Sequence, residues 1–128
     1  MAYQTDREKR ISTIKSIEPL SRTEQKMFSI ILPQKEGILL SEIWKRFEAL
    51  TGKKYSRTTI VTFLQRIEAK GYIRREKCGR VSTVFPLITQ DEYLLGEITS
   101  FCEGVFGGDV GQMMSFMSEN IERIIKLK

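Results

Sequence analysis

The order of helix starts and helix stops in the N-terminal part of the chain constrains the fold more than any other feature. A capping-box spacing, Ser-x-x-Glu, predicts that a first helix opens at Ser21 and runs to about residue 32. Ser41 is expected to cap a second helix that ends at Gly52. A third helix is expected to start near Ser56 and to stop at Gly71. The second and third helices are close enough in sequence to form a helix-turn-helix pair.

Two β-prone runs follow the third helix. Residues 72–76 and 81–85 flank a turn at Gly79, and Pro86 ends the second run, which together predict a β-hairpin. Three short helices followed by a hairpin are typical of a winged helix, a mainly α fold in which the hairpin is the wing. In such a fold the third helix enters the major groove of DNA.

The last forty residues predict two more helices with a large apolar surface. Thr89 and Glu92 form a second capping box, "FGGD" breaks the helix that follows, and Asp109 caps a final one. Two helices cannot bury this much apolar surface on each other, so they need a third body. The winged helix itself or the same helices of a second copy could supply it, and we favour a symmetric dimer. Cys102 is expected to be core, and the expected dimerisation residues are Leu94, Ile98, Phe101, Val105, Phe106, Met113, Met114, Met117 and Ile121. The predicted domains are therefore an N-terminal polar tail (1–20), a winged-helix DNA-binding domain (21–88) and a helical dimerisation region (89–128).

Charge is distributed unevenly along the chain, whose formal net charge is +5. Residues 1–88 hold 18 Lys and Arg against 9 Asp and Glu, a net +9, whereas residues 89–128 hold 3 against 7, a net −4. Residues 53–80 alone hold 9 basic and 2 acidic residues, a net +7. Basic density of this kind in an ordered segment favours a polyanion partner, whereas the acidic C-terminal part is expected to stay off DNA.

Hydroxyl and basic side chains share the polar face of the third helix. Thr59, Thr62 and Arg66 lie opposite its apolar stripe, and short hydroxyls permit close approach to a phosphate or to a thymine methyl. The wing adds arginines and lysine that are expected to contact phosphates. The expected DNA-binding residues are Lys53, Lys54, Ser56, Arg57, Thr58, Thr59, Thr62, Arg66, Lys70, Arg74, Arg75, Lys77 and Arg80.

Several function classes lack support in the sequence. The chain has no histidine and only two cysteines, Cys78 and Cys102, so we predict no metal site, no cofactor and no enzymatic activity. No run of 18 apolar residues and no signal-peptide pattern is present, which predicts a cytoplasmic protein with no membrane insertion. The alternative to a DNA-binding repressor is a winged helix that serves as a protein-interaction module and reads no DNA sequence.

From about Leu20 to Glu119 the chain resembles the penicillinase repressor family, BlaI/MecI/CopY. The resemblance is carried by "LSRTEQKMFSIIL", "SEIWKRF", "YSRTTIVTFLQRIEAKGYIRREKCGRVSTVFPL" and "FGGDVGQMMSFMSE". Its most specific parts are Thr-Thr-x-x-Thr-x-Leu-x-Arg at 58–66 and Phe-Gly-Gly at 106–108. The resemblance implies a homodimeric repressor on a palindromic operator. It also implies release when a membrane-bound sensor zinc protease cuts the dimerisation region. In the family the bond that is cut is Asn-Phe, and at the corresponding position this chain has Ser115–Phe116.

Overall fold

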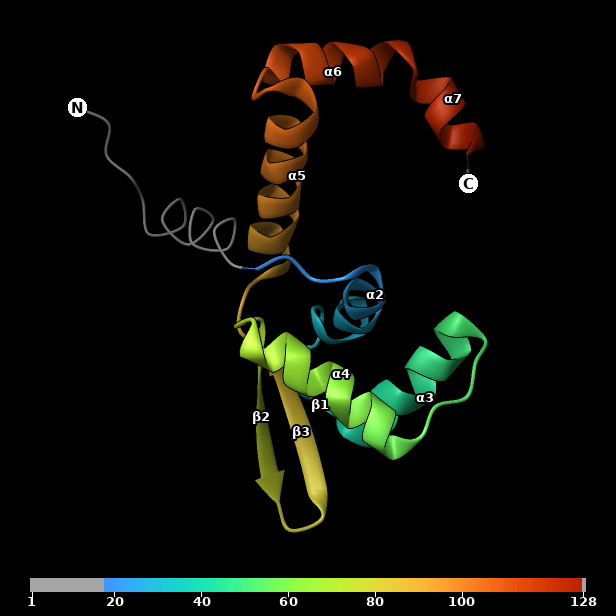
Figure 1. The fold of residues 1–128 in the computed structure, drawn as a ribbon, viewed down its shortest axis with the longest axis vertical. Helices are drawn as coiled ribbons and strands as arrows, with labels where there is room; N and C mark the ends of the chain where they lie inside the picture. Colours follow the sequence, from blue (N-terminus) through green and yellow to red (C-terminus); the bar gives the residue numbers. More distant parts are fainter. Residues whose placement is uncertain (1–17, 128) are drawn as a thin grey trace, which may run out of the picture.

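The computed structural model describes residues 18–127 and shows a winged helix with a helical arm (Figure 1). Of the N-terminal tail predicted over residues 1–20, residues 1–17 lie outside the described residues. The arm leaves the winged helix at the end opposite to the tip of the hairpin (Figure 1). The elements are α2 (Arg22–Ile31), β1 (Ile38–Leu39), α3 (Leu40–Thr51), α4 (Arg57–Ala69), β2 (Ile73–Cys78), β3 (Val81–Pro86), α5 (Gln90–Phe106), α6 (Val110–Glu119) and α7 (Ile121–Lys126).

The first helix begins where the capping box predicted. The Glu24 backbone N–H donates to Ser21 Oγ at 3.2 Å, and the Ser21 backbone N–H donates to Glu24 Oε1 at 2.9 Å. Both bonds satisfy backbone donors that the first turn of a helix leaves free. The apolar side chains on one face of α2 and at its C-cap are buried: Met27, Phe28, Ile31 and Leu32.

The start of the second helix was predicted wrongly. Leu39, not Ser41, is the N-cap of α3, and no side chain caps this helix. The cause is a contact in the tertiary structure. Leu39 is also the last residue of β1, and it pairs antiparallel with Thr83 of β3. Gly37 stands just before β1 with φ +96°, and an added Cβ there would lie 2.6 Å from a Phe85 ring carbon. Only glycine fits at this close approach.

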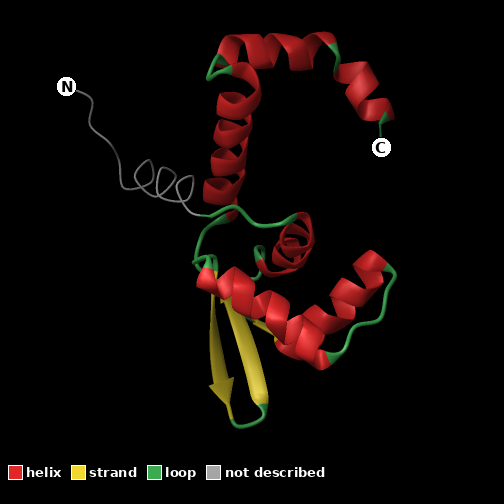
Figure 2. Cartoon of the chain, in the orientation of Figure 1, coloured by secondary structure: helices red, strands yellow, loops and turns green. Residues whose placement is uncertain are grey.

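The wing is a three-stranded sheet rather than the two-stranded hairpin predicted. Its strand order is β1-β3-β2 and all neighbours are antiparallel. In the hairpin, Ile73 pairs with Pro86 and Cys78 pairs with Val81, so the turn is at Gly79 and Arg80. The short β1 covers the other edge of β3 and ties the base of the wing to the start of α3 (Figure 2).

One apolar core holds these elements together. Its buried side chains come from α2, α3, α4 and the sheet, and Phe28, Phe47, Ile60 and Val84 are fully buried in it. The core extends along the chain from Leu20 to Ile88. Because α4 contributes its entire apolar stripe to this core, its polar face is turned outward.

The C-terminal arm consists of three helices instead of the two predicted. Thr89 and Asp109 cap α5 and α6 as expected, and Gly107 ends α5 in the left-handed conformation. The final helix breaks at Asn120, whose side-chain amide donates to the Phe116 carbonyl oxygen at 2.8 Å. This side chain competes with the backbone pattern of a continuous helix, so α7 starts in a new direction. Within residues 18–127 no helix has the length and apolar character needed to cross a bilayer.

Candidate nucleic-acid interface

The N-terminus of α4 is built by its own hydroxyl side chains. Ser56 caps the helix, accepts a hydrogen bond from the Thr59 backbone N–H at 3.2 Å, and shares a 2.9 Å hydrogen bond with the Thr59 hydroxyl. Thr62 donates its hydroxyl to the Thr58 carbonyl oxygen at 2.9 Å, which leaves its methyl group and an oxygen lone pair for a ligand. Ser56, Arg57 and Thr58 are exposed. The first turn of α4 therefore presents small polar groups and a positive helix end to solvent.

A polar cluster that sequence reasoning missed holds the loop before α4. The Trp44 indole N–H donates to the Tyr55 carbonyl oxygen at 3.0 Å, and the Tyr55 backbone N–H donates to Glu48 Oε2 at 2.8 Å. The hydrogen bond from the Tyr55 backbone lowers the pKa of Glu48; burial opposes this effect, and the Lys54 charge and the Trp44 hydrogen bond add to it, so that the pKa lies below its ordinary value. The helical spacing of Trp44 indicates only an apolar side chain of α3, and nothing in it indicates that the indole nitrogen fixes the start of α4.

The basic residues of this region fall into two groups. Lys54, Lys70, Arg74 and Arg75 each contact a carboxylate of the chain. The other group has no carboxylate partner among residues 18–127 and is exposed: Lys53, Arg57, Arg66, Lys77 and Arg80. A cation without an internal partner gives up no ion pair when it binds a phosphate, so the second group has the stronger chemistry for a polyanion.

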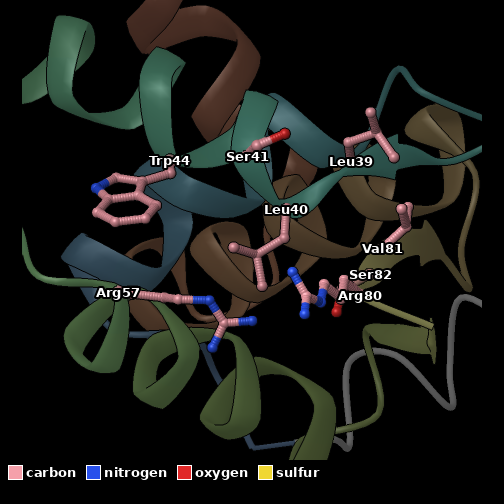
Figure 3. A pocket seen from close by; sticks show the side chains of 8 residues that line it. All are labelled: Leu39, Leu40, Ser41, Trp44, Arg57, Arg80, Val81 and Ser82. Carbon is pink, nitrogen blue, oxygen red and sulfur yellow. The ribbon is translucent and has the colours of Figure 1, made fainter. Parts of the chain in front are cut away.

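Two of these unpaired cations line one groove. Arg57 comes from the first turn of α4 and Arg80 from the turn of the wing, and in Figure 3 both guanidinium groups point into the space between these elements. The groove has a volume of about 210 Å³, and its remaining walls are Leu39, Leu40, Ser41, Trp44, Val81 and Ser82. Ser41, which does not cap α3, lies here in the first turn of that helix. Two arginine side chains that face the same groove can together bind an anionic group such as a phosphate.

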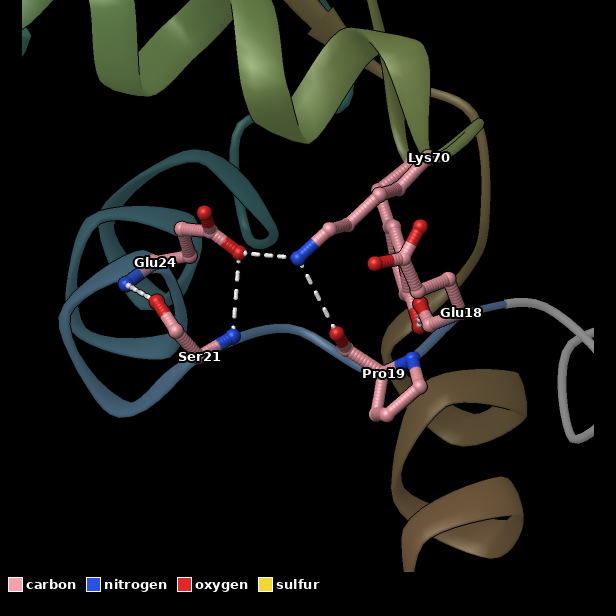
Figure 4. A network of polar contacts seen from close by, with 6 residues as sticks. Glu18, Pro19, Ser21, Glu24 and Lys70 are labelled. Carbon is pink, nitrogen blue, oxygen red and sulfur yellow. Dashed lines mark hydrogen bonds and ion pairs between the residues drawn. The ribbon is translucent and has the colours of Figure 1, made fainter.

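Lys70 lies apart from this face. Its amino group is 2.6 Å from Glu24 Oε1 and donates to the Pro19 carbonyl oxygen at 3.1 Å (Figure 4). Only 15% of the Lys70 side chain is exposed. We therefore leave Lys70 out of the candidate interface, because its amino group is mostly buried at the far end of α4 and already pairs with the Glu24 carboxylate.

The two arginines of β2 are held against the protein surface. The Arg75 guanidinium donates to Glu68 Oε1 at 2.9 and 3.1 Å, which joins β2 to α4. Arg74 pairs with Glu76, and its guanidinium carbon lies 4.0 Å from the centre of the Phe85 ring. Both side chains stiffen the wing, and any phosphate contact by either must be shared with these partners.

The predicted dimerisation residues are mostly exposed on the arm. Of this set Met113 is buried, and Cys102, which was expected to be core, is buried as well; both lie close to the junction of α5 and α6. Phe106 is half-buried and its ring lies 5.9 Å from that of Phe101 and 6.1 Å from that of Phe116. The exposed members of the predicted set are Leu94, Ile98, Phe101, Val105, Met114, Met117 and Ile121, and Ile124 and Ile125 of α7 are exposed as well. The candidate cleavage residues Ser115 and Phe116 lie in α6 and are exposed.

Element order, sheet and cationic face define the class of the molecule as a winged-helix DNA-binding protein. The model of the penicillinase repressor family matches residues 20–125, and the chain belongs to this family of repressors. The resemblance seen in the sequence is thereby confirmed.

The chain is also similar to several solved structures. The chain is similar to the DNA-binding domain of the repressor BlaI, known from its solution structure, with 27% identity and a TM-score of 0.50 over 61% of this chain and 92% of that domain. It is also similar at 17% identity and a TM-score of 0.45 to Sco3205, a MarR family transcriptional regulator from Streptomyces coelicolor solved in complex with DNA, with 94% of this chain and 76% of that one covered. The same identity and TM-score relate it to MepR, a transcription regulator of the Staphylococcus aureus multidrug efflux pump MepA, over 94% of this chain and 87% of that one. No curated protein matches the chain at a significant level.

Proposed function

We propose that this protein is a sequence-specific transcriptional repressor that binds a palindromic operator as a homodimer. The observation that carries the proposal is the face formed by α4 and the turn of the wing, where Arg57, Arg66 and Arg80 have no carboxylate partner in residues 18–127. A winged helix places this face in and beside the major groove. Occupation of a promoter by such a dimer excludes the transcription machinery.

Within this face the residues have two roles. Thr58, Thr59, Thr62 and Arg66 lie on α4, and Arg66 is the long side chain that reaches base edges, where Arg reads guanine through two hydrogen bonds. Lys53, Ser56, Arg57, Lys77 and Arg80 contact phosphates and fix the position of α4 on the duplex, with Lys54, Arg74 and Arg75 contributing after partial release from their partners.

The arm supplies the dimer contact. Many large apolar side chains of the arm are exposed, as is typical of a surface that another chain covers, and α6 and α7 extend away from the winged helix (Figure 1). A second copy of the same arm is the partner that matches this surface and gives the two-fold symmetry of a palindrome.

Cleavage at Ser115–Phe116 would release the repressor. The cut removes the end of α6 and all of α7, and with them Met117, Ile121 and Ile124 of the apolar surface. Peptidases bind extended backbone, so α6 must unwind locally before its bond is cut. A chain ended at residue 115 tests this step without a protease: it should sediment as a monomer, and persistence of the dimer would contradict release by this cut.

Arg66 tests the reading of sequence. Arg66→Ala should weaken binding to an operator selected from genomic fragments by about 1–3 kcal/mol and relax preference at one base position. The exposed Lys26 of α2 provides the control variant Lys26→Ala, which removes a charge outside the interface. Equal losses on operator and random duplex would show that Arg66 contacts only the backbone. No preference of the wild-type chain for any duplex would replace the proposal with a protein-interaction module.

A further inference from the structure

Three rings connect the arm to the winged helix. The Phe28 ring, fully buried in α2, lies 5.5 Å from the Tyr72 ring and 5.1 Å from the Tyr93 ring, each in an edge-to-face arrangement. The Tyr72 and Tyr93 rings are 6.2 Å apart with an interplanar angle of 80°. We name Phe28, Tyr72 and Tyr93 the aromatic joint. Edge-to-face contacts of this kind have a preferred geometry as well as apolar area, so they resist rotation of one element against another.

Tyr72 links the joint directly to the recognition helix. Its backbone N–H donates to the Ile67 carbonyl oxygen of α4 at 3.3 Å, and its own carbonyl oxygen accepts from the Leu87 N–H at 2.9 Å. Its hydroxyl donates to the Glu18 carbonyl oxygen at 3.2 Å. One residue therefore contacts the end of α4, the connection into α5 and the segment before α2.

Tyr93 is the residue of the aromatic joint that belongs to the arm. It lies in the first turn of α5 and is the apolar side chain of that helix that packs against the winged-helix core in the described chain. Burial, with a smaller effect of Glu97 and Tyr72, raises the pKa of Tyr93 to about 12, so the ring stays neutral in its site. Beyond Tyr93 the apolar side chains Leu94, Leu95 and Ile98 are exposed.

We propose that Tyr93 is a spacing-determining residue, which fixes the angle between α5 and α4 and so sets the operator half-site spacing that the dimer accepts. This inference rests on the proposed function, because spacing has meaning only for a dimer on two half-sites. In that dimer the arms are joined, so the position of each α4 depends on how rigidly its own arm meets its winged helix.

The geometry of DNA makes the angle selective. One base pair of spacer shifts a half-site by about 3.4 Å and rotates it by about 34° around the duplex. A joint that holds its angle within that range accepts one spacing and rejects its neighbours. The Leu87–Tyr72 backbone hydrogen bond and the buried Ile88 secure the connection into α5, but both precede the helix, so loss of the Tyr93 ring is expected to widen the range of directions that α5 adopts.

Binding to operators of different spacers tests the inference. The duplexes carry two copies of the preferred half-site separated by the preferred spacer or by one or two base pairs more or fewer. The wild-type dimer should lose about tenfold or more in affinity for each change of one base pair. Tyr93→Ala should lose less than about threefold over the same series, and Tyr93→Phe, which keeps the ring, should match the wild type. Ser100→Ala, at an exposed position farther along α5, is the control.

A duplex with a single half-site separates the possible outcomes. Equal affinity of all variants for it shows that the winged helix is folded, and Tyr93→Leu, which keeps apolar volume, replaces Tyr93→Ala if the latter fails this check. A Tyr93 variant that keeps the wild-type spacing optimum while binding the single half-site normally overturns the inference and leaves the proposed function standing. A wild-type chain that gains nothing from a second half-site at any spacing overturns the proposed function, and the inference with it.

Discussion

The amino group of Lys70 lies 2.6 Å from Glu24 Oε1, which joins the end of α4 to the capping box of α2. The Lys70 side chain is 15% exposed and that of Glu24 is 5% exposed, so the pair is shielded from water (Figure 4). The other end of α4 is fixed by Trp44 and Glu48 through the backbone of Tyr55. The helix that we propose contacts DNA is therefore held at both ends before it binds, which reduces the ordering cost of binding.

Lys70→Met should destabilise the fold without weakening DNA binding. The substitution leaves a buried Glu24 carboxylate without its cation, and we expect a loss of about 3 kcal/mol in the free energy of unfolding. Urea unfolding measures this loss, and titration of operator DNA under conditions where the variant is folded measures affinity. A drop in affinity with a salt slope reduced by about 0.9 would contradict our placement, because it would mean that Lys70 neutralises a phosphate.

Glu24 should make stability depend on pH in the acid range. Burial raises the pKa of Glu24, but the hydrogen bonds from Lys70 and Ser21 and the Lys70 charge outweigh it, so the pKa lies below its ordinary value of 4.5. A group with a depressed folded pKa stabilises the fold above its unfolded pKa, and this contribution is lost as the pH falls through the folded pKa. Glu24→Gln keeps a capping-box side chain but cannot titrate.

Comparison of the two proteins isolates this effect. The stability advantage of the wild type over Glu24→Gln should be constant near neutral pH and shrink between about pH 5 and pH 2, as followed by urea unfolding at each pH. An advantage that stays the same over this range would show that the Glu24–Lys70 pair does not couple protonation to folding.

Arg57 and Arg80 should each contribute to the salt dependence of binding. If each neutralises one phosphate, Arg57→Ala and Arg80→Ala should each reduce the slope of log affinity against log salt by about 0.9. Fluorescence titration of labelled operator at several salt concentrations gives these slopes, and Lys26→Ala should leave the slope unchanged. A weaker affinity with an unaltered slope would indicate that the arginine supports the wing without contacting a phosphate.

Gly37→Ala should be more damaging than Gly52→Ala. Both glycines have positive φ, +96° and +70°, so both substitutions carry backbone strain of about 1 kcal/mol. At Gly37 the new Cβ would also lie 2.6 Å from Phe85 and 2.8 Å from Thr83, whereas at Gly52 nothing lies within 4 Å. We expect an extra loss of about 1–3 kcal/mol for Gly37→Ala in thermal or urea unfolding. Equal losses in the free energy of unfolding would show that Phe85 and Thr83 move aside for the added Cβ at no cost.

Local rules predicted the parts of the fold that local contacts decide. The caps at Ser21, Ser56, Thr89 and Asp109 all form, because each depends on a side chain and a backbone N–H three residues away. The same rule was wrong at Ser41, because pairing of Leu39 with Thr83 in the sheet starts the helix earlier. A contact between residues this far apart in sequence leaves no local signal.

The candidate site was predictable in outline but not in the roles of its charges. Density of basic residues located the face, yet it could not separate Arg57, which is free of carboxylates within residues 18–127, from Lys70 or Arg75, which are paired. The partners of the paired residues lie on other elements, such as Glu24 on α2. In contrast, the break at Asn120 had a visible signal, since Asn side chains compete for backbone groups within helices.

The stoichiometry of the complex with DNA shows whether the protein acts as a two-fold dimer. Sedimentation equilibrium of the full chain at micromolar concentration, alone and with a duplex carrying its footprinted site, measures both the oligomeric state and the number of chains per duplex. We expect a dimer in solution and two chains on each two-fold duplex, with protection on both half-sites. A monomer that binds without two-fold protection, or a chain that protects no tract of DNA, would contradict it.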